Sequence, residues 1–177
     1  MSWVTETRMV QLCGVARSTW QSWVREALFT VPAASAFQLA DCLEVLLASV
    51  VREHFSLTET RSIWEGLRKS GEVTRLVEAA EAVVPDDSVR FDLVIDPAFG
   101  EVSLATDDAS LASAILTERP RLVQVVPLSE RIRALKAGFE RIASDDPLPT
   151  LRRGRPPRAS AGSARDAADV IELGSRR

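Results

Sequence analysis

Apolar residues recur three or four positions apart through the first 80 residues, and short apolar runs between turn residues replace this pattern beyond residue 85. Helical spacing places such residues on one helix face, whereas short β-rich runs bounded by turn residues are typical of strands. The sequence therefore predicts helices over residues 6–13, 17–27, 39–54, 72–83 and 129–143. It also predicts a helix capped by Ser56 or Thr58 that runs to about residue 69, and one capped by Thr106 or Asp107 that runs to about residue 117. It predicts strands over residues 89–96, 101–105 and 122–126, the last as a buried strand.

The first two predicted helices, within Thr5–Arg25, are short and joined by a tight turn. Thr5 is expected to cap the first helix and Ser18 the second, and Gly14 stands at the joint, where a left-handed backbone is often required. The inner faces are supplied by Met9, Val10, Leu12, Val15, Trp20, Trp23 and Val24. The residues left to face outward are Arg17, Ser18, Thr19, Gln21, Ser22 and Arg25. This division is typical of a helix-turn-helix, whose second helix enters the major groove of DNA.

The outward residue types suit contact with double-stranded DNA. Arginine pairs with the O6 and N7 atoms of guanine, glutamine pairs with adenine, and serine or threonine contacts phosphates or base edges. The alternative interpretation is the solvated surface of a helical interaction domain. Trp20 and Trp23 are expected in the core rather than against bases.

The order of elements predicts a mainly α protein with a small α+β part. We expect the N-terminal helix-turn-helix domain to span residues 1–84 and a C-terminal β-β-α-β-α domain to span residues 85–144. Dimerisation, partner docking and ligand sensing are open roles for the second domain. Residues 145–177 are rich in Pro, Arg, Ser, Ala and Gly, which is typical of a disordered tail, and residues 149–177 carry seven basic and three acidic side chains.

The tail contains a second candidate DNA contact around the sequence Arg-Gly-Arg-Pro, which is similar to the core of an AT-hook. Gly154 lets the backbone approach the floor of a narrow minor groove, whose negative potential attracts arginine. The residues concerned are Arg152, Arg153, Arg155 and Arg158. The alternatives are general attraction of a basic segment to phosphates and a chance match in an arginine-rich tail.

Two further phrases give the N-terminal part a family resemblance. The Ala36–Leu43 sequence AFQLADCL and the Phe55–Arg61 sequence FSLTETR follow the two short helices at suitable spacing. With them, about the first 70 residues resemble the MerR-type winged helix-turn-helix family. The resemblance implies a strand-turn wing after the second helix, double-stranded DNA as the partner and a homodimer on a two-fold site. Because Val31–Ser35 is short and apolar for a wing tip, direct readout is expected from residues 17–25, with backbone contacts from the tail.

Composition and charge narrow the remaining function classes. The net charge is −3, but the acidic excess lies in residues 81–148, away from both candidate DNA contacts. We find no apolar run of the roughly 20 residues that a membrane span needs, and no signal-peptide pattern. Cys13 and Cys42 are expected as reduced core residues, which favours a cytoplasmic, nucleoid-associated protein.

Sites for metals and catalysis are not expected. His54 is the single histidine, and a zinc site needs several histidine or cysteine ligands. We therefore interpret His54 as a residue that closes the C-terminal end of its helix. Four carboxylates are interpreted as solvated surface: Asp86, Asp87, Asp92 and Asp96. We find no phosphate loop, nucleophile motif or cofactor motif, so neither an enzyme nor a cofactor is expected.

The sequence thus favours a sequence-specific DNA-binding protein, with transcription regulation as its role. Two alternatives stay open. One is a DNA-binding accessory factor of a mobile element or segregation system, acting in excision or partition. The other is an antitoxin-like interaction protein.

Overall fold

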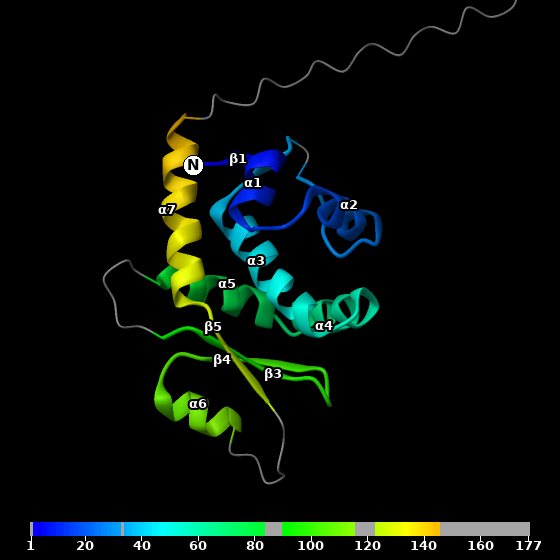
Figure 1. Cartoon of the computed structure of the whole chain (residues 1–177), viewed down its shortest axis with the longest axis vertical. Coiled ribbons are helices and arrows are strands. Elements are labelled where there is room, and N and C mark those ends of the chain that lie inside the picture. Colours follow the sequence, from blue (N-terminus) through cyan, green and yellow to red (C-terminus); the bar gives the residue numbers. More distant parts are fainter. Residues whose placement is uncertain (1, 33, 84–89, 116–122, 146–177) are drawn as a thin grey trace, which may run out of the picture.

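The structure is a computed structural model, and it describes residues 2–32, 34–83, 90–115 and 123–145. Over these residues the chain is mainly helical, with a two-stranded and a three-stranded antiparallel sheet (Figure 1). This confirms the expected combination of helices with a small α+β part, in the order β-β-α-β-α after residue 85. Among the described helices there is none whose length and apolar character would let it cross a membrane.

The N-terminal elements are β1 (Val4–Thr5), α1 (Glu6–Leu12), α2 (Arg17–Arg25) and β2 (Ala36–Phe37). β1 pairs with β2, opposing Val4 to Phe37. The predicted cap at Thr5 is confirmed, because its hydroxyl accepts a hydrogen bond from the Arg8 amide at 3.4 Å. The predicted cap at Ser18 is wrong. Gly14 turns the chain with a φ of +66° and Ala16 is extended, so α2 begins one residue before Ser18.

Three helices follow with ends close to those predicted: α3 (Leu39–His54), α4 (Leu57–Lys69) and α5 (Glu72–Ala82). α3 and α4 each begin at a capping box. At α4 the Ser56 amide donates to the Glu59 carboxylate at 2.8 Å, and the Ser56 hydroxyl accepts from the Glu59 amide at 3.3 Å. α3 lies at the centre of the helical part, because half of its residues are buried apolar side chains.

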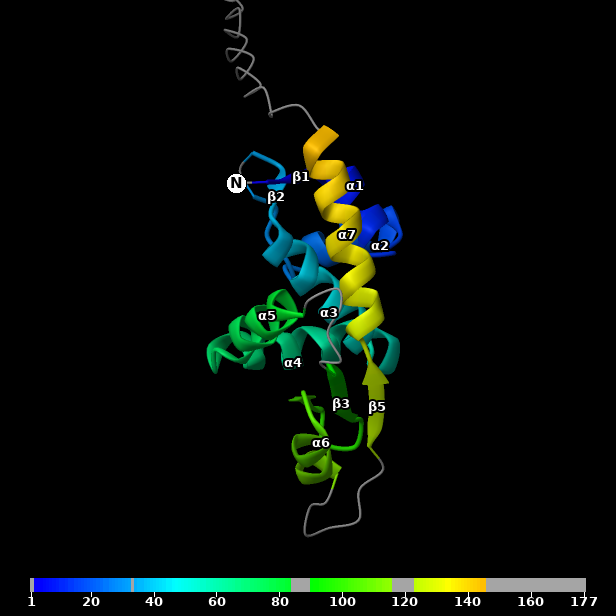
Figure 2. The same cartoon turned by 90° about the vertical axis from the view of Figure 1, so that its left-hand side faces the viewer.

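The three-stranded sheet contains β3 (Asp92–Asp96), β4 (Glu101–Ala105) and β5 (Gln124–Pro127), in the spatial order β4-β3-β5. α6 (Asp108–Ile115) lies on one side of the sheet and the helical part lies on the other (Figures 1 and 2). The prediction of a buried strand at 122–126 is wrong, because β5 is an edge strand with half-buried valines. The buried strand is the central one, β3.

Two predicted surface carboxylates of β3 are also buried. The Asp92 side chain is 2% exposed and pairs with Arg90, and Asp96 is 4% exposed. Oδ1 of Asp96 accepts the Ala98 amide at 3.0 Å. These partners offset the cost of removing the carboxylates from water. The sequence pattern did not reveal that these two side chains are buried. The surface interpretation is therefore wrong for this pair, while Asp86 and Asp87 lie outside the described residues.

The last described helix, α7 (Ser129–Asp145), returns to the N-terminal elements and packs against α1, α3 and β1 (Figure 2). The helical spacing of Ile132, Leu135, Phe139 and Ile142 predicts one inner face for this helix, and the structure confirms it: the first three are buried, and Ile142 is half-buried against the core. Gly138 lies at the crossing with α1, where an added Cβ would stand 2.7 Å from Leu12 Cδ2. Most of the buried apolar residues, from Val4 to Phe139, form one hydrophobic cluster. The division of the chain at residue 84 stays a prediction.

Candidate nucleic-acid interface

α2 has one polar face open to solvent and one aromatic face in the core. Trp20 and Trp23 are 1% and 2% exposed, which confirms their predicted place. Arg17, Gln21 and Arg25 are exposed and lie at positions i, i+4 and i+8, so they share one stripe about 12 Å long. We call these three residues the α2 stripe. The helix contains no acidic residue and two arginines, so the stripe is a locally positive surface on an acidic protein.

The other predicted contact residues of α2 lie around this stripe rather than on it. Ser18 is exposed in the first turn, where the amide groups of a helix attract anions. Ser22 is half-buried and its hydroxyl accepts a hydrogen bond from Arg25 at 3.4 Å. Thr19 is half-buried and borders a cavity together with Trp23, one turn further along. Thr19 therefore lies on a different side of α2 from Arg25.

The aromatic face holds α2 in place. The ring centroid of Trp20 lies 5.5 Å from that of Phe29 and 5.7 Å, edge-on, from that of Phe37 in β2. Trp23 lies 5.9 Å from Phe29. Each such pair contributes about 0.5–1.5 kcal/mol beyond the area it buries. The segment after α2 and the short β2 strand are thus attached to the helix that carries the stripe.

Arg68 of α4 secures the same segment from the other side. Its guanidinium donates to the Leu28 carbonyl at 2.6 Å and to the Glu44 carboxylate at 2.7 Å, and it stacks over the Phe29 ring at 5.2 Å. The Trp64 indole also donates to Glu44, at 3.0 Å. Sequence reasoning missed this positioning role, although Trp64 and Arg68 stand one helical turn apart. The pairing is long-range, so only the fold could reveal it.

The segment between α2 and β2 packs partly against the body of the protein. Val31 and Pro32 are half-buried and Val31 contacts the hydrophobic cluster, while Ala34 and Ser35 are exposed. Ala33 and the four candidate tail arginines, Arg152, Arg153, Arg155 and Arg158, lie outside the described residues. The described interface is therefore centred on α2.

His54 and Asp107 lie at the ends of helices. His54 is the last residue of α3, as expected. Asp107 accepts the Ser110 amide at 2.6 Å next to the start of α6, and this hydrogen bond lowers the pKa of Asp107. In the described part of the chain, histidine, cysteine and carboxylate side chains form no group able to hold a metal ion.

Both cysteines are buried and free, as expected for core residues. The Cys13 thiol donates to the Cys42 carbonyl at 3.2 Å. A hydrogen bond to Cys42 and then burial raise the pKa of Cys13, so its thiol resists ionisation. Cys13 caps the end of α1 directly before the turn to α2, and both cysteine side chains are part of the core.

Comparison of the sequence with protein-family models and with curated proteins gives no match. The side chains of α2 and their supports are therefore the basis for assigning a function.

Proposed function

We propose that this protein binds double-stranded DNA with sequence preference and regulates transcription, with α2 as the helix that enters the major groove. The α2 stripe carries the proposal. Arg17, Gln21 and Arg25 are exposed along one side of a helix whose other side is fixed by buried tryptophans. A rigid helix with arginine and glutamine on its free face suits hydrogen bonding to base edges.

The arrangement around α2 supports a MerR-type winged helix-turn-helix as the finer fold assignment. α1 and α2 are joined by a left-handed Gly14, and β2 follows α2 and pairs with β1. α3 and α4 come next, in the order expected from the resemblance. The wing is reduced to the short segment before β2, so α2 supplies the base contacts in this proposal.

Each residue of the interface has a proposed role. Arg17 and Arg25 donate to guanine, and Gln21 forms a two-point contact with adenine. Ser18 and the first-turn amides of α2 contact a phosphate, and the tail arginines add attraction that falls with salt. A homodimer places two copies of α2 on a two-fold site, which doubles the contacts.

Selection of bound sequences from a random DNA pool tests the proposal, followed by fluorescence anisotropy on the selected duplex and a scrambled one. Arg17→Ala, Gln21→Ala and Arg25→Ala should each weaken binding to the selected duplex by on the order of 1–3 kcal/mol. Arg75→Ala is the matched control. Arg75 is exposed on α5, away from α2, and pairs with Glu72 on its own helix.

Two results contradict the proposal. One is equal affinity of the protein for selected and scrambled duplexes across a salt series. The other is an α2 stripe variant that binds the selected duplex as well as Arg75→Ala does. A mobility shift on tandem sites separates the roles that DNA binding allows, because ladder-like spreading favours an excision or partition factor and one discrete complex favours a regulator.

A further inference from the structure

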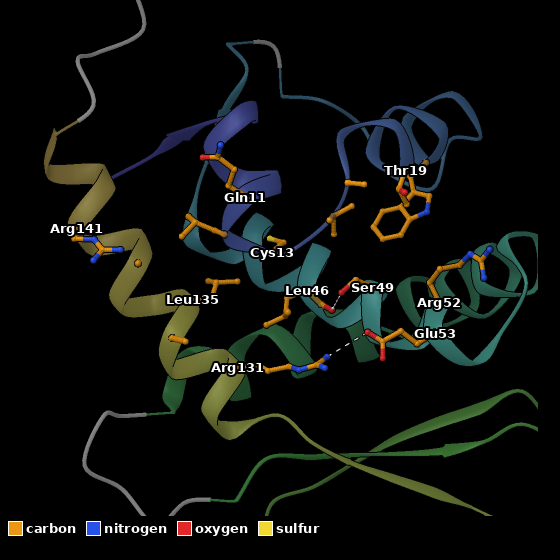
Figure 3. Close-up of a pocket in the computed structure, with 17 residues that line it drawn as sticks. Gln11, Cys13, Thr19, Leu46, Ser49, Arg52, Glu53, Arg131, Leu135 and Arg141 are labelled. Atoms are coloured by element: carbon orange, nitrogen blue, oxygen red, sulfur yellow. Dashed lines mark hydrogen bonds and ion pairs between the residues drawn. The ribbon is translucent and has the colours of Figure 1, made fainter.

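A cavity of about 780 Å³ lies between α7 and the turn that joins α1 to α2, with α3 also lining it (Figure 3). Its walls come from segments more than a hundred residues apart in the sequence. The volume falls within the range of small-molecule sites, which is roughly 300–1,000 Å³. The cavity is therefore large enough for a compact organic ligand.

The wall of the cavity is partly apolar and partly polar. Leu46, Leu135 and Trp23 lie in the wall but are only 6%, 2% and 2% exposed, so they back it rather than face its space. The half-buried Leu12 and Val15 supply its accessible apolar surface. An apolar molecular body that covers these two side chains would remove their exposed surface from water, which favours binding.

The charged residues of the wall are mostly arginines. Arg52, Arg131 and Arg141 line the cavity with a single carboxylate, Glu53, so these four side chains carry a net charge of +2. Arg52 donates to the Phe55 carbonyl at 2.5 Å, which keeps it at the end of α3. An anion at this wall is favoured electrostatically over a neutral or cationic molecule.

The ion pair between Arg131 and Glu53 can be replaced by an ion pair between Arg131 and a bound anion. The two groups lie 3.6 Å apart and their side chains are 52% and 55% exposed, so this pair across α7 and α3 is weak. A ligand carboxylate or sulfonate can instead accept hydrogen bonds from the Arg131 guanidinium at a normal distance of about 2.7–2.9 Å. Such charge-assisted hydrogen bonds are stronger than an open surface pair.

We propose that this cavity binds a small amphipathic anion, with its carboxylate or sulfonate on Arg131 and its apolar body against Leu12 and Val15. Glu53 is then a competitor for Arg131 rather than a partner of the ligand. Removing Glu53 and removing Arg131 consequently change the affinity in opposite directions. A nonspecific apolar surface would not give this pair of opposite effects.

The site also touches the helix that carries the α2 stripe. Thr19 and Trp23 of α2 line it, as do Gly14 and Val15 of the preceding turn. A ligand held between this turn and α7 alters DNA affinity if it fits one position of α2 better than another. This second step rests on the proposed function, whereas binding of the anion does not.

The test uses the full chain and the fluorescent probe 8-anilinonaphthalene-1-sulfonate, an aromatic anion. Saturable binding of one probe per chain is expected. N-phenyl-1-naphthylamine has the same aromatic body without the sulfonate and should bind more weakly. Octanoate should displace the probe, and octanol at the same concentration should not.

The variants make the test specific. Arg131→Gln should weaken probe binding at least about tenfold, and Glu53→Gln should strengthen it about two- to fivefold. Arg75→Gln, on α5, is the control for charge and should leave the affinity unchanged. Equal affinities of Arg131→Gln, Glu53→Gln and the unchanged protein, or equal binding of the charged and neutral probes, would overturn the proposal.

Two further measurements separate the other outcomes. A synthetic peptide of residues 164–177, whose central residues 166–173 carry three carboxylates among apolar side chains, should not displace the probe. Displacement at micromolar peptide would make the C-terminal segment of the chain the occupant and overturn the small-molecule assignment. Anisotropy with the selected duplex, with and without octanoate, tests the link to α2. A DNA affinity that octanoate does not change removes the link to α2 and leaves anion binding standing. The variant Arg17→Ala, which should bind DNA more weakly, should bind the probe as tightly as the unchanged protein.

Discussion

Replacement of Gly138 by alanine tests the close crossing of α7 and α1. A Cβ at this position would stand 2.7 Å from Leu12 Cδ2, and real Cβ contacts almost never fall below 3.0 Å. The Leu12 side chain must therefore rotate or α7 must move away from α1. Gly66 of α4 is a matched control, because it is also a helical glycine but a Cβ there meets no atom within 4 Å among the described residues.

The two substitutions share one energy term and differ in another. Alanine in place of glycine within a helix stabilises the folded state by about 0.8–1.0 kcal/mol. Gly66→Ala should gain this amount in the free energy of unfolding. Gly138→Ala should gain the same amount and lose about 1–2 kcal/mol to overpacking, at the lower end of the usual range because the end of a leucine side chain can move. The net result is a protein of unchanged or slightly lower stability.

Urea unfolding followed by tryptophan fluorescence measures both values, because Trp20, Trp23 and Trp64 are buried in the folded state. Leu12→Ala should cost less in the Gly138→Ala protein than in the unchanged one, since truncation removes the clash. A gain for Gly138→Ala equal to that for Gly66→Ala would show that α7 does not approach α1 this closely.

Three other predictions follow from single contacts. Arg68→Met should lower the free energy of unfolding by about 1–3 kcal/mol in the urea assay, because the Leu28 carbonyl loses a charged donor; an unchanged midpoint would contradict the positioning role. The hydrogen bond from the Ser56 side chain lowers the pKa of Glu59, so this carboxylate stabilises the fold above its ordinary pKa of 4.5 and the contribution disappears as the pH falls through the lowered value. Glu59→Gln should therefore lose less stability than the unchanged protein between pH 5 and pH 3, and parallel acid profiles would be the contrary result. Cys13, whose pKa is raised, should react with Ellman's reagent slowly when folded and rapidly in denaturant, whereas fast reaction of the folded protein would place the thiol at the surface.

Local signals explain the parts of the fold that the sequence predicted well. α3 and α4 begin at capping residues and end where their apolar period stops, so Leu39–His54 was predictable to the residue and the ends of Leu57–Lys69 to within about two residues. The inward place of Trp20 and Trp23 follows from the same period. These features depend on residues within one or two helical turns.

Features that depend on distant partners were not predictable. An apolar run does not show whether a strand is central or at an edge, so β5 was expected to be buried. Asp92 is tolerated inside because Arg90 is beside it, and α7 was recognised as amphipathic without any indication that its partner is α1. The role of Arg68 and the cavity beside Arg131 arise from segments that meet only in the fold. In contrast, the division of α2 into stripe and core was visible from the sequence, apart from Thr19 and Ser22, which were expected to face outward and are half-buried.

The contact of β1 with α7 joins the first described strand to the last described helix, and this has a consequence for synthesis on the ribosome. α1 ends at residue 12, α3 ends at residue 54 and α7 begins at residue 129, so 116 and 74 residues lie between them and α7. At the usual rate of about 5–20 residues per second, α1 waits roughly 6–23 s and α3 roughly 4–15 s for the helix that covers them. During this interval Leu12 and Leu46 lack the α7 side of their environment, and the growing chain exposes apolar surface to chaperones and to other chains. A protein interrupted before residue 129 should therefore aggregate or be degraded, even though all of α2 has already been made.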